Sequence, residues 1–142
     1  MTQRIVRGAW RAKRDPAYRL ELGSLGAVVD WGYAPDYTDA MARIVAQDEP
    51  GDYVIASGEP HTVRDFVEVA FGAAGVDWRV HVVERAGIVS RDQPQLIGDA
   101  TKLRERTGWR PTVAFAELVG ILLRAAEAKD AAEPAAGAPR HR

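Results

Sequence analysis

The sequence predicts a small α+β domain of about four helices and a few short strands. Several segments repeat apolar residues with the 3.6-residue period of amphipathic helices, and shorter segments alternate or form brief apolar runs typical of strands. The chain has 142 residues, which favours a single domain, and it shows no repeat of about 20–50 residues. A dinucleotide-binding domain needs a glycine-rich turn between a strand and a helix, whereas the nearest segment, Gly23–Gly26, leads into apolar residues.

The first half of the chain predicts two helices and two strands. Residues 3–14 carry an apolar stripe, and Asp15-Pro16 ends this helix because the residue before a proline avoids helical backbone angles. Residues 19–22 and 27–31 suit short strands. A second helix begins at Pro35, and its helical spacing predicts a buried face made of Tyr37, Ala40, Met41, Ile44 and Val45.

The second half begins with a short apolar run at residues 53–56, which predicts a buried strand between Gly51 and Gly58. Thr62 and Asp65 then have the spacing of a capping box, a pair of reciprocal hydrogen bonds that starts a helix. Gly75 is expected to end this helix, because glycine adopts the left-handed conformation of a helix C-terminus. Another strand is predicted at residues 80–83.

The remaining residues predict one loop and two helices. Residues 85–98 have weak periodicity and suggest a loop, while residues 99–106 suggest a short helix. Thr112 is expected to start the last helix. The Ala, Pro, Gly and Arg composition of residues 133–142 provides nothing to pack, so we expect a domain at residues 1–132 followed by a disordered tail.

The overall composition argues against several classes of protein. Nineteen basic and twenty acidic residues give a net charge of −1, which disfavours general nucleic-acid and membrane-surface binding. The absence of cysteine excludes disulfides, thiolate metal sites and cysteine nucleophiles. No apolar run approaches the roughly 20 residues of a membrane span, so we expect a cytoplasmic protein. Sixteen arginines against three lysines favour recognition of phosphate or carboxylate groups.

The titratable residues do not form a recognisable catalytic or metal-binding motif. His61, His81 and His141 lack the spacing of metal ligands. We expect His61 to be a turn histidine bonded to backbone and His81 to face solvent. Glu59 follows a predicted strand end, where ligands often bind in α/β proteins, although a carboxylate that stabilises a turn is the favoured interpretation.

Five segments together form a more specific pattern. In chain order they are TQRI (residues 2–5), DWGYAPDY (30–37), QDEPGDYVIASGEPHTVRDFV (47–67), LIGD (96–99) and TGWRP (107–111). Over about residues 2–125 the chain resembles the C-terminal part of the GDP-mannose 4,6-dehydratase family of extended short-chain dehydrogenases/reductases. The middle segment is specific to this family, whereas the last two are shared by many nucleotide-sugar enzymes.

The resemblance implies the substrate-binding lobe of an enzyme that converts GDP-mannose to GDP-4-keto-6-deoxymannose and water. In the family, NADP takes a hydride from C4, water leaves across C5–C6, and the hydride returns to C6. The cofactor site and the catalytic Tyr-x-x-x-Lys pair belong to a Rossmann domain, and no tyrosine of this chain has a lysine four positions later. We therefore expect a truncated or split enzyme with no catalytic, cofactor-binding or metal-binding residues, which alone binds no NADP and has no activity.

The resemblance also implies contacts to the GDP moiety. The lysine near the start of the family's first helix in this lobe falls on Arg4, which keeps the positive charge but changes the donor geometry. The two basic residues before the family's Asp-Trp pair fall on Val28 and Val29, which carry no charge.

Further contacts are expected in the loop before Gly98. Counted back from Gly98, the family's arginine falls on Val89 and its glutamate on Asp92, which can accept hydrogen bonds from ribose hydroxyls. A shifted loop would let Arg91 replace the missing arginine. Losing one arginine–phosphate contact costs about 10–100-fold in affinity, because a charge-assisted hydrogen bond contributes about 1.5–3 kcal/mol.

Three interpretations remain open. The chain is the substrate lobe of a nucleotide-sugar dehydratase, in which case a separate Rossmann-domain chain or self-association covers an exposed apolar patch. Alternatively, it is a non-catalytic module that binds nucleotide sugars or a protein partner, an interpretation that Val28 and Val29 favour. A nucleic-acid-binding role for the basic first helix is disfavoured, because aromatic residues do not alternate with its basic residues.

Overall fold

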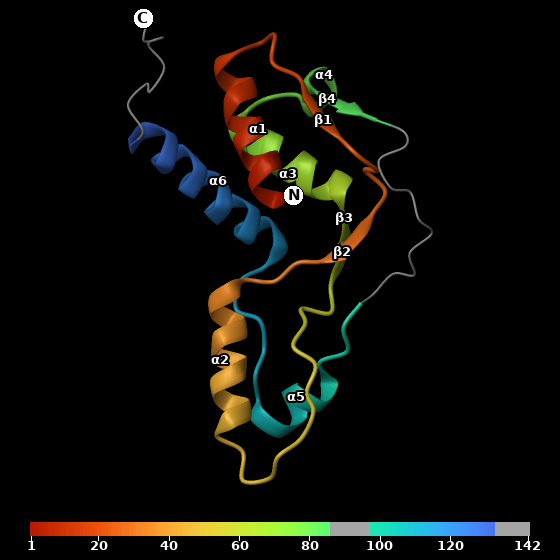
Figure 1. Ribbon diagram of the computed structural model, residues 1–142, viewed down its shortest axis with the longest axis vertical. Coiled ribbons are helices and arrows are strands. Elements are labelled where there is room, and N and C mark those ends of the chain that lie inside the picture. Colours follow the sequence, from red (N-terminus) through yellow and green to blue (C-terminus); the bar gives the residue numbers. More distant parts are fainter. Residues whose placement is uncertain (86–96, 133–142) are drawn as a thin grey trace, which may run out of the picture.

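The computed structural model describes residues 1–85 and 97–132, and the predicted tail lies outside this part. Its longer helices form two groups along the long axis of the molecule (Figure 1). The three-helix group consists of α1 (Thr2–Arg14), α3 (Val63–Ala74) and α6 (Phe115–Ala132), and the two-helix group of α2 (Ala34–Val45) and α5 (Thr101–Thr107). With the one-turn α4 (Trp78–His81), the described residues contain six helices rather than about four. The mixed helix and strand content agrees with the prediction.

The three-helix group contains the main core. The predicted helix over residues 3–14 is confirmed, and its apolar stripe is buried against α3 and α6, as expected for an amphipathic helix. The buried residues that the three helices contribute to this core are Ile5, Val6, Ala9, Ala12, Val63, Phe66, Val67, Ala70, Phe71, Ala74, Val119, Leu123 and Ala126. None of the helices in the described residues is both long enough and apolar enough to cross a membrane.

In the described residues, four short strands form two separate two-stranded sheets. β1 (Leu20–Leu22) pairs in parallel with β4 (Val82–Glu84), and β2 (Val28–Asp30) pairs antiparallel with β3 (Pro60–Thr62). β1 and β2 match the strands predicted at residues 19–22 and 27–31. The β2–β3 pair lies between the two helix groups in Figure 1, so it connects the upper and lower parts of the molecule.

Local sequence signals determine both ends of α3. The predicted capping box is present, because the Thr62 side chain accepts a hydrogen bond from the Asp65 backbone, and the Asp65 carboxylate accepts one from the Thr62 backbone. These bonds hold the pKa of Asp65 below its usual value, and burial only partly offsets them. Gly75 ends the helix in the left-handed conformation, with φ of 74°.

Three predictions of strands or of a buried face fail in the structure. Residues 80–83 are not one strand, because Asp77 caps the one-turn α4 before β4 begins. Residues 53–56 pair with no strand in the described part of the chain, and Val54 is 51% exposed. On α2 only part of the predicted face is buried: Met41 and Val45 are exposed, because no described element covers them.

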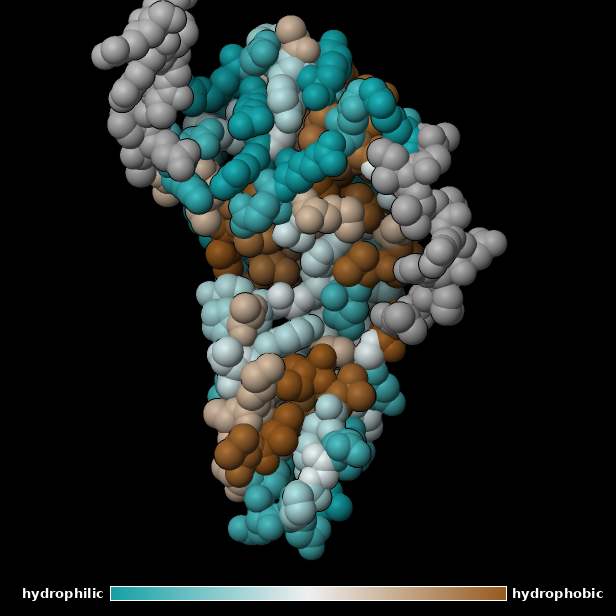
Figure 2. Space-filling model, in the orientation of Figure 1, coloured by the Kyte–Doolittle hydropathy of each residue, from teal (hydrophilic) through white to brown (hydrophobic). Residues whose placement is uncertain are grey.

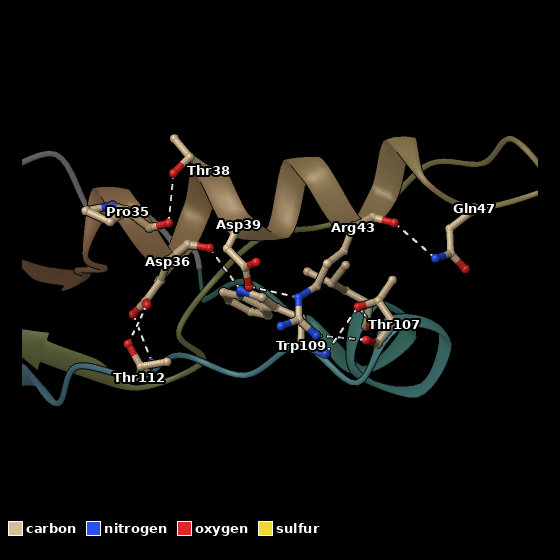
Figure 3. A network of polar contacts seen from close by, with 10 residues as sticks. Pro35, Asp36, Thr38, Asp39, Arg43, Gln47, Thr107, Trp109 and Thr112 are labelled. Atoms are coloured by element: carbon tan, nitrogen blue, oxygen red, sulfur yellow. Dashed lines mark hydrogen bonds and ion pairs between the residues drawn. The ribbon is translucent and has the colours of Figure 1, made fainter.

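The two-helix group has its own small core and is joined to α6 through a polar network. Ala40, Ala100, Leu103 and Trp109 form that core. The Trp109 indole donates a hydrogen bond to the Asp36 carbonyl, and the Asp36 carboxylate accepts bonds from Thr112 (Figure 3). Because these bonds hold Thr112 outside the helix, α6 begins at Phe115 and not at Thr112 as predicted.

Candidate functional site

An arginine-lined groove follows one face of α1. It has a volume of about 340 Å³ and is lined by Gln3, Arg4, Arg7, Arg11 and Tyr18. The three arginines are spaced at i, i+3 and i+7, which places them on one side of the helix. All three are exposed, and none of them forms an ion pair with an acidic residue that the structure describes. We call this feature the α1 groove.

The chemistry of the α1 groove suits an anionic ligand. A guanidinium group presents a planar set of donors that matches a phosphate or carboxylate, and here three such groups have no described acidic partner. Tyr18 adds an aromatic ring at the same groove. Arg4, which the sequence singled out, is therefore accompanied by Arg7 and Arg11. Their helical spacing from Arg4 is the signal that was available in the sequence.

Of the other predicted positions, those that the structure describes do not line this groove. Val28 and Val29 lie half-buried in β2, where they pair with Thr62 and His61 of β3. They offer no charged group to a phosphate. Arg91 and Asp92, like the aligned Val89, lie outside the described residues.

A second hollow lies where the two helix groups meet, and we call it the junction pocket. Its volume is about 330 Å³. Side chains from β3, from α5 and from the connections between elements surround it: Trp31, Ser57, Glu59, His61, Arg104, Arg110, Pro111, Thr112, Val113, Ala114 and Phe115. Sequence analysis missed this pocket, because its residues come from three separate segments whose proximity only the folded chain shows.

Asp30, at the end of β2, organises one wall of the junction pocket. Its carboxylate accepts hydrogen bonds from the backbone amides of Ser57 and Gly58, at 3.1 and 2.9 Å, and from the Ser57 hydroxyl. Gly58 has φ of 79°, a conformation that glycine adopts without strain. Burial, together with the negative charge of Asp30, raises the pKa of nearby Tyr37.

The histidines differ from the sequence expectations. His61 lies in β3 with its ring stacked on Phe115, with ring centroids 3.7 Å apart, and its Nε2 atom is buried without a hydrogen-bond partner. His81 is only 6% exposed and does not face solvent, because its Nδ1 atom lies 2.9 Å from the Tyr18 carbonyl. Glu59 is exposed at the junction pocket, and its carboxylate accepts no hydrogen bond from a described residue.

In the described residues, the Gly23–Gly26 segment is not a phosphate-binding turn and no cluster of metal ligands is present. Gly23–Gly26 connects β1 to β2, so it does not present its amides at the start of a helix as a phosphate-binding turn does. Within residues 1–85 and 97–132, no group of three His, Asp or Glu side chains is arranged to hold a metal ion.

Comparison with known proteins assigns the chain to a family. A family model described as GDP-mannose 4,6 dehydratase matches residues 1–122, which is most of the sequence. The chain belongs to the GDP-mannose 4,6-dehydratase family. GDP-mannose 4,6 dehydratase 1 of Arabidopsis thaliana is 39% identical over 124 residues, covering 87% of this chain and 34% of the relative. The human GDP-mannose 4,6 dehydratase is 36% identical over 143 residues, covering 88% of this chain and 38% of the relative.

Solved structures show the same fold in part of larger proteins. RMD from Pseudomonas aeruginosa, complexed with NADPH, superposes with a TM-score of 0.80 at 24% identity, covering 90% of this chain and 42% of that protein. dTDP-glucose 4,6-dehydratase from Bacillus anthracis, in complex with NAD, gives a TM-score of 0.75 at 19% identity, covering 89% of this chain and 39% of that protein. This member of the dehydratase family therefore spans little more than a third of the curated relatives that it matches.

Proposed function

We propose that this chain is the nucleotide-sugar-binding lobe of a GDP-mannose 4,6-dehydratase and that residues 1–132 form this lobe. The observation that carries the proposal is the family match over residues 1–122. In this role the lobe binds the nucleotide part of GDP-mannose, while NADP and the catalytic residues belong to a Rossmann domain. The chain alone then has no dehydratase activity.

The α1 groove supports this role. Arg4 occupies the position at which the family places a lysine against the diphosphate, and the structure shows Arg7 and Arg11 beside it. In our proposal these guanidinium groups share the negative charge of the diphosphate. They thereby compensate for Val28 and Val29, which take the places of two basic residues. Arg91 and Asp92 contribute further contacts to the phosphate and the ribose.

The exposed apolar face of the lower half supports a Rossmann partner. Met41, Val45, Val54 and Ile97 are all exposed, and Figure 2 shows apolar surface over the region of α2 and residues 53–56. Residues 53–56 are also apolar but pair with no described strand, so their backbone can join a sheet that another domain supplies. We propose that the Rossmann domain docks on this apolar face, which we define by these four exposed residues.

A calorimetric titration tests the binding role. The purified full chain is titrated with GDP-mannose, GDP and UDP-glucose. We expect the two guanine nucleotides to bind and UDP-glucose to bind more weakly. Arg4→Gln should weaken binding about 10–100-fold, because a charge-assisted hydrogen bond contributes about 1.5–3 kcal/mol. Arg14→Gln is the matched control, since Arg14 lies on the same helix but does not line the groove.

The outcome also separates the proposal from its alternative. Arg14→Gln should bind GDP-mannose as the unmodified chain does. If a folded chain binds none of the three nucleotides at millimolar concentration, the proposed substrate lobe is ruled out. The alternative of a non-catalytic module that binds a protein partner would then be favoured, because Val28 and Val29 leave β2 without a basic group.

A further inference from the structure

The junction pocket contains charged groups that the proposed function does not use. Arg104 of α5 and Arg110 of the following connection both line it. Neither guanidinium forms an ion pair or donates a hydrogen bond to another described residue. The α1 groove and the junction pocket share no lining residue, so they are separate sites.

His61 provides a third polar group that lacks a partner. Its Nε2 atom is buried and makes no hydrogen bond, although buried polar atoms in folded proteins are nearly always paired. Stacking on Phe115 fixes the plane of the imidazole ring. Because Nε2 is already buried by the chain itself, His61 forms part of the pocket wall and does not hydrogen-bond a ligand.

Acceptor groups occupy the same pocket. The Glu59 carboxylate accepts no hydrogen bond from a described residue and can receive bonds from hydroxyl groups. The Ser57 hydroxyl already donates to Asp30 and accepts from the Glu59 amide, so it is held in place and keeps one free acceptor position. Trp31 adds an aromatic surface. Donors for an anion and acceptors for hydroxyls are therefore combined in one hollow.

We propose that the junction pocket binds a small phosphate monoester that carries hydroxyl groups, such as a sugar phosphate. Arg104 and Arg110 bind the phosphate, Glu59 accepts hydrogen bonds from the hydroxyls, and the His61 ring forms part of the wall. The volume of about 330 Å³ is at the lower end of the range of about 300–1,000 Å³ for ligand pockets, so it suits a monosaccharide better than a dinucleotide.

The junction pocket lies where the two helix groups meet, so a ligand bound there stabilises their arrangement. Arg104 belongs to the two-helix group, whereas His61 and Phe115 belong to elements that contact the three-helix group. A ligand bound in this hollow contacts both groups. Ligand binding should therefore also raise the unfolding temperature of the chain, because it stabilises the folded state alone.

Calorimetry with glucose 6-phosphate as the probe tests the proposal, with inorganic phosphate and glucose as comparisons at constant ionic strength. We expect saturable binding of glucose 6-phosphate, weaker binding of inorganic phosphate and none of glucose. Arg110→Gln and Arg104→Gln should each weaken binding about tenfold or more. Arg106→Gln removes one charge from the same helix outside the pocket and should leave the affinity unchanged.

Two further results keep this test independent of the α1 groove. Arg4→Gln should retain glucose 6-phosphate binding, and in the unmodified chain the ligand should shift the NMR signal of the His61 ring. The proposal is overturned if glucose 6-phosphate does not saturate, or if Arg4→Gln abolishes binding while Arg110→Gln retains it. An unshifted His61 signal at saturation also contradicts it. None of these results depends on whether GDP-mannose binds.

Discussion

At the scale of single residues, Asp36 is the carboxylate on which the connection between α2 and α6 depends. It is 7% exposed and accepts hydrogen bonds from Thr112 and Val113. Burial acts to raise its pKa, but the bonds from Thr112 and Val113 outweigh that effect and hold the pKa below its usual value. The folded chain therefore needs this side chain to be charged.

The pH dependence of stability follows from this lowered pKa. The unfolded chain protonates Asp36 near the ordinary value of about 3.9, at a higher pH than the folded chain does. The stabilisation is complete above that pH and is lost as the pH falls through the folded pKa. We expect Asp36→Asn to reduce the free energy of unfolding at pH 7 by about 1–3 kcal/mol, because a neutral amide oxygen accepts the bonds from the Thr112 and Val113 amides less strongly than a charged carboxylate does.

Urea unfolding at pH 7 and between about pH 2.5 and 5 measures both effects. The unfolding free energy of Asp36→Asn should fall less steeply in acid than that of the unmodified chain, since one shifted group has been removed. Asp39→Asn is the control, because Asp39 lies on the same helix in an exposed ion pair with Arg43. Equal stability of the two variants at pH 7 would contradict this role for Asp36.

At the scale of elements, the capping box of α3 gives a prediction of its own. Thr62→Ala removes the side-chain acceptor for the Asp65 amide, a bond of 3.1 Å, and should destabilise the chain by about 1 kcal/mol. Hydrogen exchange at the Asp65 amide should become faster. Thr38→Ala is a matched control, because the Thr38 hydroxyl is an exposed donor inside α2 and caps no helix. If both variants lose the same stability, the cap is not the cause.

Elements also show how far the sequence alone can predict this structure. The ends of α3 depend on Thr62, Asp65 and Gly75, which are close together in sequence, and these predictions are confirmed. The strand at residues 53–56 depends on a partner strand, which no local pattern can supply. Likewise, periodicity predicts that Val45 faces inward, yet it is 85% exposed because nothing in the described chain covers that side of α2.

The candidate sites also differ in how far residues close together in sequence determine them. Arg4 was found through a family resemblance, and Arg7 and Arg11 follow from it by helical spacing. The junction pocket combines Trp31, His61 and Arg110, whose proximity results from the packing of three distant segments. Neither composition nor periodicity carries information about that proximity, so only the three-dimensional structure reveals the pocket.

At the scale of the whole molecule, the apolar face predicts an interaction. When the chain is mixed with a separately produced Rossmann portion of a curated relative, we expect a complex that light scattering detects. Val54→Asp should weaken this complex, because the partner would then have to bury a charge within an apolar surface. Val80→Asp is the control, since Val80 is 55% exposed on α4 at the other end of the molecule. Complex formation unaffected by Val54→Asp would exclude this face as the docking surface.

The packing of α1 against α6 has a consequence for synthesis of the protein on the ribosome. These helices are separated in sequence by every other element of the described chain, yet they share one core (Figure 1). The apolar stripe of α1 therefore leaves the exit tunnel long before its partner has been translated. Until Val119 and Leu123 emerge, Ile5 and Val6 lack one of the two helices that bury them, and a chaperone that binds apolar segments can recognise them.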